Sequence, residues 1–320
     1  MTSRIHGVRF VFTGLAAALL ALACSGGGSS GGSDAAAITE DDAEAIAGAV
    51  LLAGFLAGDV TDVVEAGVDD DAGAARLGGA VPGRDVPTFT TRAPFGPSDV
   101  DCDVDGFVTL SGDVQNPGSY QTGDEVDALF VMCDDDNGFV FDGGFDFTIT
   151  SLSGDLLGDD YDVTLDALFT DFEADDGLSP IDLDGDLVWE GDLSAPPLAS
   201  YAASGTALDL AFGGDTYQLF DYDADLVIDE GEDPEEYTTS ADGRMRSSAF
   251  DGEVTYQTTQ DFMGTGTDPP ASGELVITGA FDATITVAPV DAVDVDLFLD
   301  LDGSGSTDAL VETTWSALGF

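Results

Sequence analysis

The residues best suited to chemistry form a short acidic segment near the end of the chain. Oxygen-bearing side chains recur at alternate positions, in Asp300, Asp302, Ser304, Ser306 and Asp308. Ca²⁺ favours several oxygen ligands on a tightly turned backbone, with glycine at the sixth loop position, where Gly305 stands. The twelfth position departs from the calcium pattern, because Val311 stands there and Glu312 follows one residue late. One interpretation is a calcium site of these five residues and Glu312, and the other is a solvated turn between two strands.

The N-terminal residues have the form of a signal peptide. A short positive region with Arg4 and Arg9 precedes an apolar run over residues 10–23. That run has signal-peptide length, whereas a membrane-spanning helix takes about 20 residues. Residues 1–23 are therefore predicted to be a signal peptide.

Residues 21–24, Ala-Leu-Ala-Cys, resemble a lipobox, the site at which bacterial lipoproteins are cleaved and acylated. The resemblance implies that Cys24 becomes the first mature residue and carries acyl chains, and two or more chains anchor a protein stably. Ser25 resembles the sorting signal for the outer membrane of Gram-negative bacteria. The Gly/Ser-rich residues 24–37 are then a flexible tether. An ordinary secretory signal before an unmodified Cys24 is the alternative.

The three cysteines support an extracytoplasmic location. An odd number of cysteines is awkward in an oxidising compartment unless one is modified. If Cys24 is acylated, Cys102 and Cys133 remain, and outside the cytoplasm they are expected to form a disulfide.

Catalytic residue types are scarce. His6, the only histidine, lies in the predicted signal, and the chain has no lysine. The usual Ser–His and Ser–Lys pairs are therefore missing from the mature chain, and no phosphate-binding loop occurs. A carboxylate pair, as in glycosidases, is the catalytic alternative that is left, but among 64 acidic residues no pair stands out.

The composition is strongly acidic. The chain carries 64 Asp and Glu against 7 Lys and Arg, a formal charge of −57 at pH 7. Nucleic acid and anionic lipid are excluded as partners, since both bind positive surfaces. The acids are spread over the whole chain, which favours adaptation to a saline habitat over calcium binding as their main cause. A hydrophobic content of 43% and 20 Phe argue against disorder.

Apolar residues alternate with Asp and Thr from Asp99 onward. The clearest alternating segments are 145–149, 161–165, 208–212, 275–277, 281–287 and 293–301. This period predicts antiparallel strands with one buried and one wet face. A sheet of about a dozen strands must curl or close to bury its apolar face, so a barrel, a half-barrel and a sandwich are all alternatives. An outer-membrane barrel is disfavoured because the strands lack flanking aromatic girdles.

Dipeptides that end in glycine, such as Asn-Gly and Asp-Gly, mark the expected turns. Asn137-Gly138 predicts a hairpin between strands around Phe130 and Phe141. Similar turns are expected at Asp142-Gly143-Gly144, Asp184-Gly185, Gly213-Gly214, Asp242-Gly243 and Asp251-Gly252.

One helix is expected ahead of the sheet. Residues 38–57 have apolar side chains at helical spacing, with Thr39 as the N-cap. The helix is predicted to cover part of the sheet. Residues 58–98, rich in Gly, Ala, Asp and Pro, are predicted to be a linker or a loosely ordered segment, and residues 99–320 the β domain.

Two blocks of sequence carry a family resemblance. The first runs from Cys102 through 107–110 and 123–133 to 141–143, and the second comprises 273–280, 300–303 and Thr314-Trp315. Together they resemble a group of uncharacterised Gly- and Asp-rich bacterial lipoproteins with a Cys-to-Cys hairpin and a C-terminal acidic loop before a Trp. The likeness covers roughly residues 100 to 318. It implies an all-β envelope lipoprotein and no known activity.

The favoured function is a lipid-anchored structural or adhesive protein of the outer membrane, facing the surface or the periplasm. It is expected to be acidic, salt-adapted and without catalytic activity, with Ca²⁺ as the one cofactor considered. The first alternative is a carrier that holds an apolar ligand in a curved sheet, by analogy with half-barrel carriers. The second is a carboxylate-based glycosidase. An open apolar cavity would favour the carrier.

Overall fold

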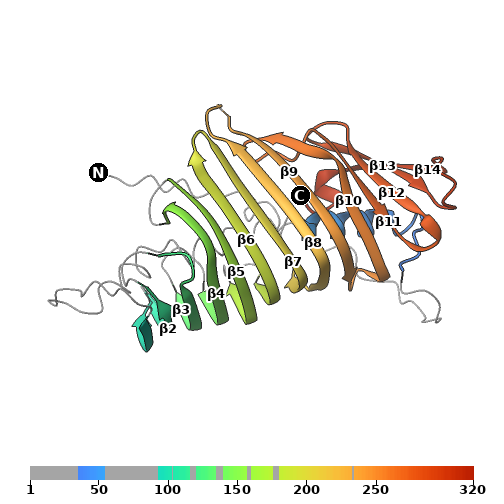
Figure 1. The fold of residues 1–320 in the computed structure, drawn as a ribbon. Helices are drawn as coiled ribbons and strands as arrows, with labels where there is room; N and C mark the ends of the chain where they lie inside the picture. Colours follow the sequence, from blue (N-terminus) through green and yellow to red (C-terminus); the bar gives the residue numbers. More distant parts are fainter. Residues whose placement is uncertain are drawn as a thin grey trace.

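The computed structural model describes residues 35–54, 93–102, 104–115, 120–134, 140–156, 160–175, 180–232 and 234–320. Within these ranges the chain is almost entirely β-structure (Figure 1). The strands are β1 Ala93–Asp101, β2 Asp105–Val114, β3 Glu125–Asp134, β4 Val140–Asp155, β5 Asp160–Asp175, β6 Ile181–Ala195, β7 Leu198–Phe212, β8 Asp215–Asp229, β9 Glu236–Ser247, β10 Phe250–Thr265, β11 Ser272–Thr278, β12 Thr284–Pro289, β13 Asp294–Asp300 and β14 Ala309–Thr314. Two short 3₁₀ turns, η2 Ala280–Asp282 and η3 Trp315–Ala317, flank the last strands.

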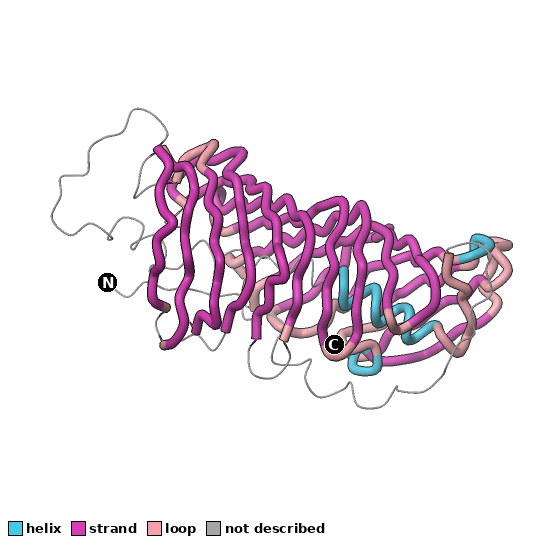
Figure 2. Tube along the Cα trace, turned by 90° about the horizontal axis from the view of Figure 1, so that it is seen from below, coloured by secondary structure: helices cyan, strands magenta, loops and turns pink. Residues whose placement is uncertain are grey.

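The fourteen described strands form a single antiparallel sheet. Each strand pairs with the next one in the sequence, from β1 at one edge to β14 at the other. The sheet is curved and is not closed into a barrel (Figures 1 and 2). The predicted all-β antiparallel meander is confirmed, and among the three shapes considered the chain adopts an open, curved one.

The alternation of side chains sets the buried face. On β5, Tyr161, Val163 and Leu165 are 7%, 0% and 0% exposed, whereas the intervening Asp162 is exposed. Aromatic rings pack along the same face, with the ring centroids of Phe145 on β4 and Phe169 on β5 lying 5.0 Å apart. Burial of this face supplies the main driving force for folding.

The predicted helix begins later than expected. Within the described residues the helix covers 43–54 and lies beside the C-terminal strands (Figure 1), and its Ile46 and Val50 are 0% and 1% exposed. It begins at 43 rather than 38 because residues 40–42 form a turn, in which the Thr39 hydroxyl donates to the Asp42 carboxylate at 2.6 Å. Residues 55–57 lie outside the described ranges. No helix within the described residues has the length and apolar character needed to cross a membrane.

Two predicted domain boundaries were wrong by a few residues. The sheet begins at Ala93 rather than at 99, so the end of the predicted linker is part of β1. Ala35 and Ala36, which were assigned to the tether, are built into the fold. Ala35 forms a parallel bridge with Glu253, and the Ala36 N–H donates to the Glu253 carbonyl at 2.8 Å.

Several Asp-Gly pairs that were predicted to be turns lie inside strands. Gly213-Gly214 does connect β7 to β8, but Asp142-Gly143-Gly144, Asp184-Gly185, Asp242-Gly243 and Asp251-Gly252 lie within β4, β6, β9 and β10. The turn at Asn137-Gly138 lies outside the described residues, although β3 and β4 do pair.

The first three of these pairs fit bulges of the neighbouring strands. Asp142 accepts the backbone N–H of Met132, at a bulge of β3, at 3.1 Å, and Asp184 accepts that of Asp171, at a bulge of β5, at 3.2 Å. The Asp242 carboxylate likewise accepts the backbone N–H of Thr258 on β10 at 2.8 Å. Such irregularities bend a sheet and increase its twist, so the Asp-Gly pairs promote curvature rather than chain reversal.

A substitution at Gly143 tests this role. Gly143 has φ 101°, and a Cβ there would lie 2.1 Å from the carbonyl oxygen of Asp171. We expect Gly143→Ala to lower the free energy of unfolding by about 2–4 kcal/mol, because it adds left-handed strain and a backbone clash. Gly144→Ala is the matched control, since its Cβ would lie 3.4 Å from Thr170, and a change within about 0.5 kcal/mol is expected. Equal effects in urea denaturation would contradict the bulge role.

Candidate functional site

The acidic segment singled out in the sequence forms the loop between β13 and β14. Asp300 ends β13, and the loop runs from 301 to 308. Asp300, Asp302 and Asp308 each direct one carboxylate oxygen to a common point, with these atoms within 4.8 Å of one another. Three converging carboxylates are a donor set that suits a hard cation such as Ca²⁺.

Backbone N–H groups of this loop donate hydrogen bonds to its carboxylates. The Asp300 carboxylate, in a residue only 9% exposed, accepts the N–H groups of Ser304 at 3.0 Å and Gly305 at 2.6 Å. Asp308 accepts the N–H of Leu301 at 2.9 Å. The hydroxyl and then the N–H of Ser304 lower the pKa of Asp302. The carboxylates of Asp300 and Asp308 therefore shape the loop through these hydrogen bonds, and the lowered pKa of Asp302 favours the ionised form that a cation requires.

The sequence prediction of the ligand set was partly wrong. Glu312 lies on β14 directly opposite Asp296 and is not part of the carboxylate cluster. The reason is that β14 begins at Ala309, so Glu312 is fixed in the ladder rather than in the loop. Ser304 and Ser306 do lie in the loop, where their hydroxyl groups hydrogen-bond to each other at 2.8 Å.

A buried acid in this protein does not by itself indicate a ligand. Asp124 is 0% exposed, and its carboxylate accepts the N–H groups of Gln115 and Gln121, each at 2.9 Å. This is the same turn-capping role that Asp300 plays. Capping alone accounts for the burial of both residues, so only the convergence of three carboxylates singles out the 300–308 loop.

A comparison of two cations tests the loop. Mg²⁺ demands a tight octahedral shell and gives up water reluctantly, so a flexible carboxylate loop should prefer Ca²⁺. At fixed ionic strength, and at a free Ca²⁺ concentration ten times the Kd, Ca²⁺ binding would stabilise the protein by about 1.4 kcal/mol. We expect Ca²⁺ to raise the Tm more than Mg²⁺ does, and Asp302→Ala to abolish the difference.

Asp291→Ala is the matched control for the loss of a turn cap. Asp291 accepts the N–H groups of Val293 and Asp294 at 2.7 and 2.9 Å, outside the carboxylate cluster. The Asp291→Ala variant should have a lower Tm than the unsubstituted protein but should still be stabilised more by Ca²⁺ than by Mg²⁺. If both ions act alike, or if Asp302→Ala keeps the preference, the loop is only a turn.

The outer face of the sheet is crowded with acids. In the ladders, acids stand directly opposite one another in the pairs Asp127–Asp146, Asp162–Asp192, Asp184–Asp209, Asp223–Asp242 and Asp296–Glu312. Directly opposed like charges destabilise a sheet. Desolvation and the charge of Asp127 raise the pKa of Asp146, and desolvation with Asp225, Asp242 and Glu190 raises that of Asp223.

The raised pKa values predict a gain of stability on mild acidification. A carboxyl whose pKa is higher in the folded than in the unfolded state takes up its proton more readily when folded. Stability should therefore rise as the pH falls from 7 toward the unfolded-state pKa of about 3.9. We expect the Tm at pH 5 to exceed that at pH 7 at low salt, and Asp146→Asn to reduce the difference. A lower Tm at pH 5 would contradict the prediction.

A shallow trough crosses this acidic face. It has a volume of about 680 Å³ and is lined by side chains of five neighbouring strands, β5 to β9. Its charged lining residues are Asp171, Glu173, Asp182, Asp184, Asp209 and Arg246. Five of these six are carboxylates, so the trough is suited to cations rather than to anions.

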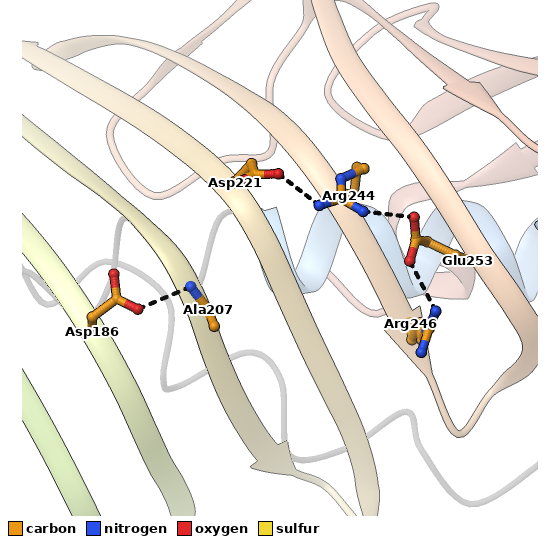
Figure 3. Close-up of polar contacts among 6 residues, drawn as sticks. All are labelled: Asp186, Ala207, Asp221, Arg244, Arg246 and Glu253. Carbon is orange, nitrogen blue, oxygen red and sulfur yellow. Dashed lines mark hydrogen bonds and ion pairs between the residues drawn. The ribbon is translucent and has the colours of Figure 1, made fainter. Parts of the chain in front are cut away.

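The two cations of the described residues lie together on β9 (Figure 3). Arg244 forms ion pairs with Asp221 at 2.6 Å and Glu253 at 2.9 Å, and Arg246 pairs with Glu253 at 3.2 Å. Both guanidinium groups also stack over the ring of Phe220, at 5.6 and 5.7 Å. The network links β8, β9 and β10 across the outer face.

A second polar contact in Figure 3 stabilises the middle of the sheet. The Asp186 carboxylate accepts the N–H groups of Thr206 at 2.8 Å and Ala207 at 3.0 Å, and the Thr206 hydroxyl at 2.8 Å. Desolvation by itself would raise the pKa of Asp186, but these hydrogen bonds outweigh it and lower the pKa.

Sequence reasoning missed the arginine network. The sequence did contain an indication of this network, because Arg244 and Arg246 are the only basic residues after Arg92 and lie two positions apart in a strand. The acidic partners of the two arginines could not be predicted, since Asp221 and Glu253 lie on neighbouring strands whose register only the folded sheet fixes.

The predicted disulfide is present. Cys102, just before β2, is joined to Cys133 on β3, with a Cα–Cα distance of 5.4 Å. Cys24 lies outside the described residues. Comparisons with protein-family models, with curated proteins and with solved structures found no match.

Proposed function

We propose that this protein is a lipid-anchored structural or adhesive protein of a bacterial envelope, held at the outer membrane by acyl chains on Cys24. The observation that carries the proposal is the acidic outer face, on which carboxylates oppose one another from β3 to β14. Such a face costs stability at low salt, where the opposed charges repel one another, and concentrated salt screens that repulsion. Ca²⁺ at the 300–308 loop is part of the proposal.

The carrier is less favoured by the described residues. A carrier needs an accessible apolar face, whereas side chains on the apolar face of the sheet, such as Ile149, Leu165 and Leu208, are 0% exposed. The trough that crosses the sheet combines the apolar residues Phe172, Leu183 and Leu210 with five exposed acids, which an apolar ligand would have to desolvate.

The glycosidase is also less favoured. A glycosidase places one carboxyl group in a setting that keeps it protonated, commonly an apolar pocket. In the trough, Glu173, Asp182, Asp184 and Asp209 are all exposed.

Mass spectrometry of the native protein tests the anchor. The expected N-terminal residue is an acylated Cys24, with nothing upstream of it. Cys24→Ser should move the protein from the membrane fraction to the soluble fraction. A free N-terminus at another residue, or membrane association that survives Cys24→Ser, would contradict the proposal.

A further inference from the structure

Phe281 is exposed in a turn that does not favour it. Its side chain is 88% exposed, and both Phe281 and Asp282 have a φ of 60°. The turn is closed by the Ala283 N–H, which donates to the Ala280 carbonyl at 3.2 Å. Positive φ at both central residues normally selects Asn-Gly, and a bulky aromatic residue there is a conformational outlier. Neither burial nor turn geometry therefore explains why this residue is Phe.

The turn is fixed beside the point where the chain enters the sheet. The Ala280 N–H donates to the Ala36 carbonyl at 2.6 Å, and the Gly279 N–H donates to the Ala283 carbonyl at 2.9 Å. A Cβ on Gly279 would lie 2.9 Å from the Ile38 side chain. Residues 279–283 are therefore hydrogen-bonded to and packed against the segment around Ala36.

The length of the preceding chain places this turn close to the proposed anchor. Ten residues, 25–34, separate Cys24 from Ala35. A chain of ten residues spans at most about 35 Å. Acyl chains on Cys24 would thus hold Ala36 and the adjoining turn near the bilayer surface.

We propose that the turn of residues 279–283 faces the bilayer and inserts the Phe281 side chain into the lipid interface. The inference rests on the proposed acylation of Cys24. Phe, like Trp and Leu, is a residue that peripheral membrane segments bury at the boundary between headgroups and acyl chains, which explains an exposed Phe at the tip of this turn. Asp282 and the exposed Asp302 lie beside it and disfavour anionic headgroups, so the lipid is zwitterionic.

Quenching by brominated lipid tests the insertion. The acylated protein would be placed in vesicles of phosphatidylcholine brominated in its acyl chains, as Phe281→Trp and, in parallel, as Val290→Trp. Val290 is 58% exposed and lies at the opposite end of β12, so it is a matched control. The native Trp189 and Trp315 are each 1% exposed and give the background measured in the unsubstituted protein.

The introduced indole of Phe281→Trp is expected to lose emission in brominated vesicles, and that of Val290→Trp to keep it. Equal quenching of the two, or quenching of neither, in protein that sediments with the vesicles would overturn the insertion and leave the anchor intact. If the unsubstituted protein does not sediment with vesicles, the proposed function fails, and the insertion fails with it.

Discussion

The Tm is expected to rise by about 10 °C or more between 0.1 and 2 M NaCl. The Debye length falls from about 10 Å to less than 3 Å over this range, so repulsion among neighbouring carboxylates is largely screened. A gain of about 4 kcal/mol in the free energy of unfolding is enough for this rise, because each kcal/mol shifts the Tm by roughly 2–4 °C in a domain of this size. Thermal unfolding followed by circular dichroism measures the change.

Two substitutions separate repulsion from other effects of salt. Asp127 stands opposite Asp146, so Asp127→Asn should raise the Tm at low salt and flatten its dependence on NaCl. Asp186→Asn is the control, because Asp186 accepts three hydrogen bonds from Thr206 and Ala207. It should lower the Tm at every salt concentration. A flat or falling curve for the unsubstituted protein would show that the acids are locally compensated and that the saline explanation is wrong.

Loss of the disulfide should cost about 3–4 kcal/mol of unfolding free energy. The bond closes a loop with a sequence separation of 31 residues, and the chain-entropy model gives this magnitude for that length. The double variant Cys102→Ser/Cys133→Ser should therefore unfold at lower urea concentration than the unsubstituted protein at the same salt.

The loss should be concentrated at one edge of the sheet. β1 pairs only with β2 within the described strands, and the disulfide joins Cys102, directly after β1, to the end of β3. Amide hydrogen exchange should accelerate most in β1–β3. A reducing agent should destabilise the unsubstituted protein and leave the double variant unchanged. Equal stability of the two proteins in urea would refute the prediction.

The sequence by itself determined the class of fold. The period-two alternation in segments such as 161–165 places apolar side chains on one face whatever the partner strand is, and short turns then favour pairing of neighbours. The disulfide was predicted from the number of cysteines together with the predicted extracytoplasmic location. The three aspartates of the 300–308 loop could be identified because their spacing is local.

Tertiary structure decided what depends on contacts between strands. Asp142-Gly143 has the composition of a hairpin turn, but a bulge at Met132 supplies an N–H that its carboxylate accepts, so the pair lies inside β4. Glu312 follows the acidic loop in sequence, but pairing with Asp296 removes it from the cluster. Both outcomes depend on the register between two strands, which is set by the patterns of both strands and by the turn that joins them.

Phe281 shows the same limit most clearly. Its alternation with Ala283, Ile285 and Val287 predicts an inward-facing strand residue. The chain instead turns at 280–283, where the Ala280 N–H bonds to Ala36, and β12 begins only at Thr284. Local sequence specified an apolar side chain at this position, and a contact with a segment more than two hundred residues away in the sequence placed it in solvent.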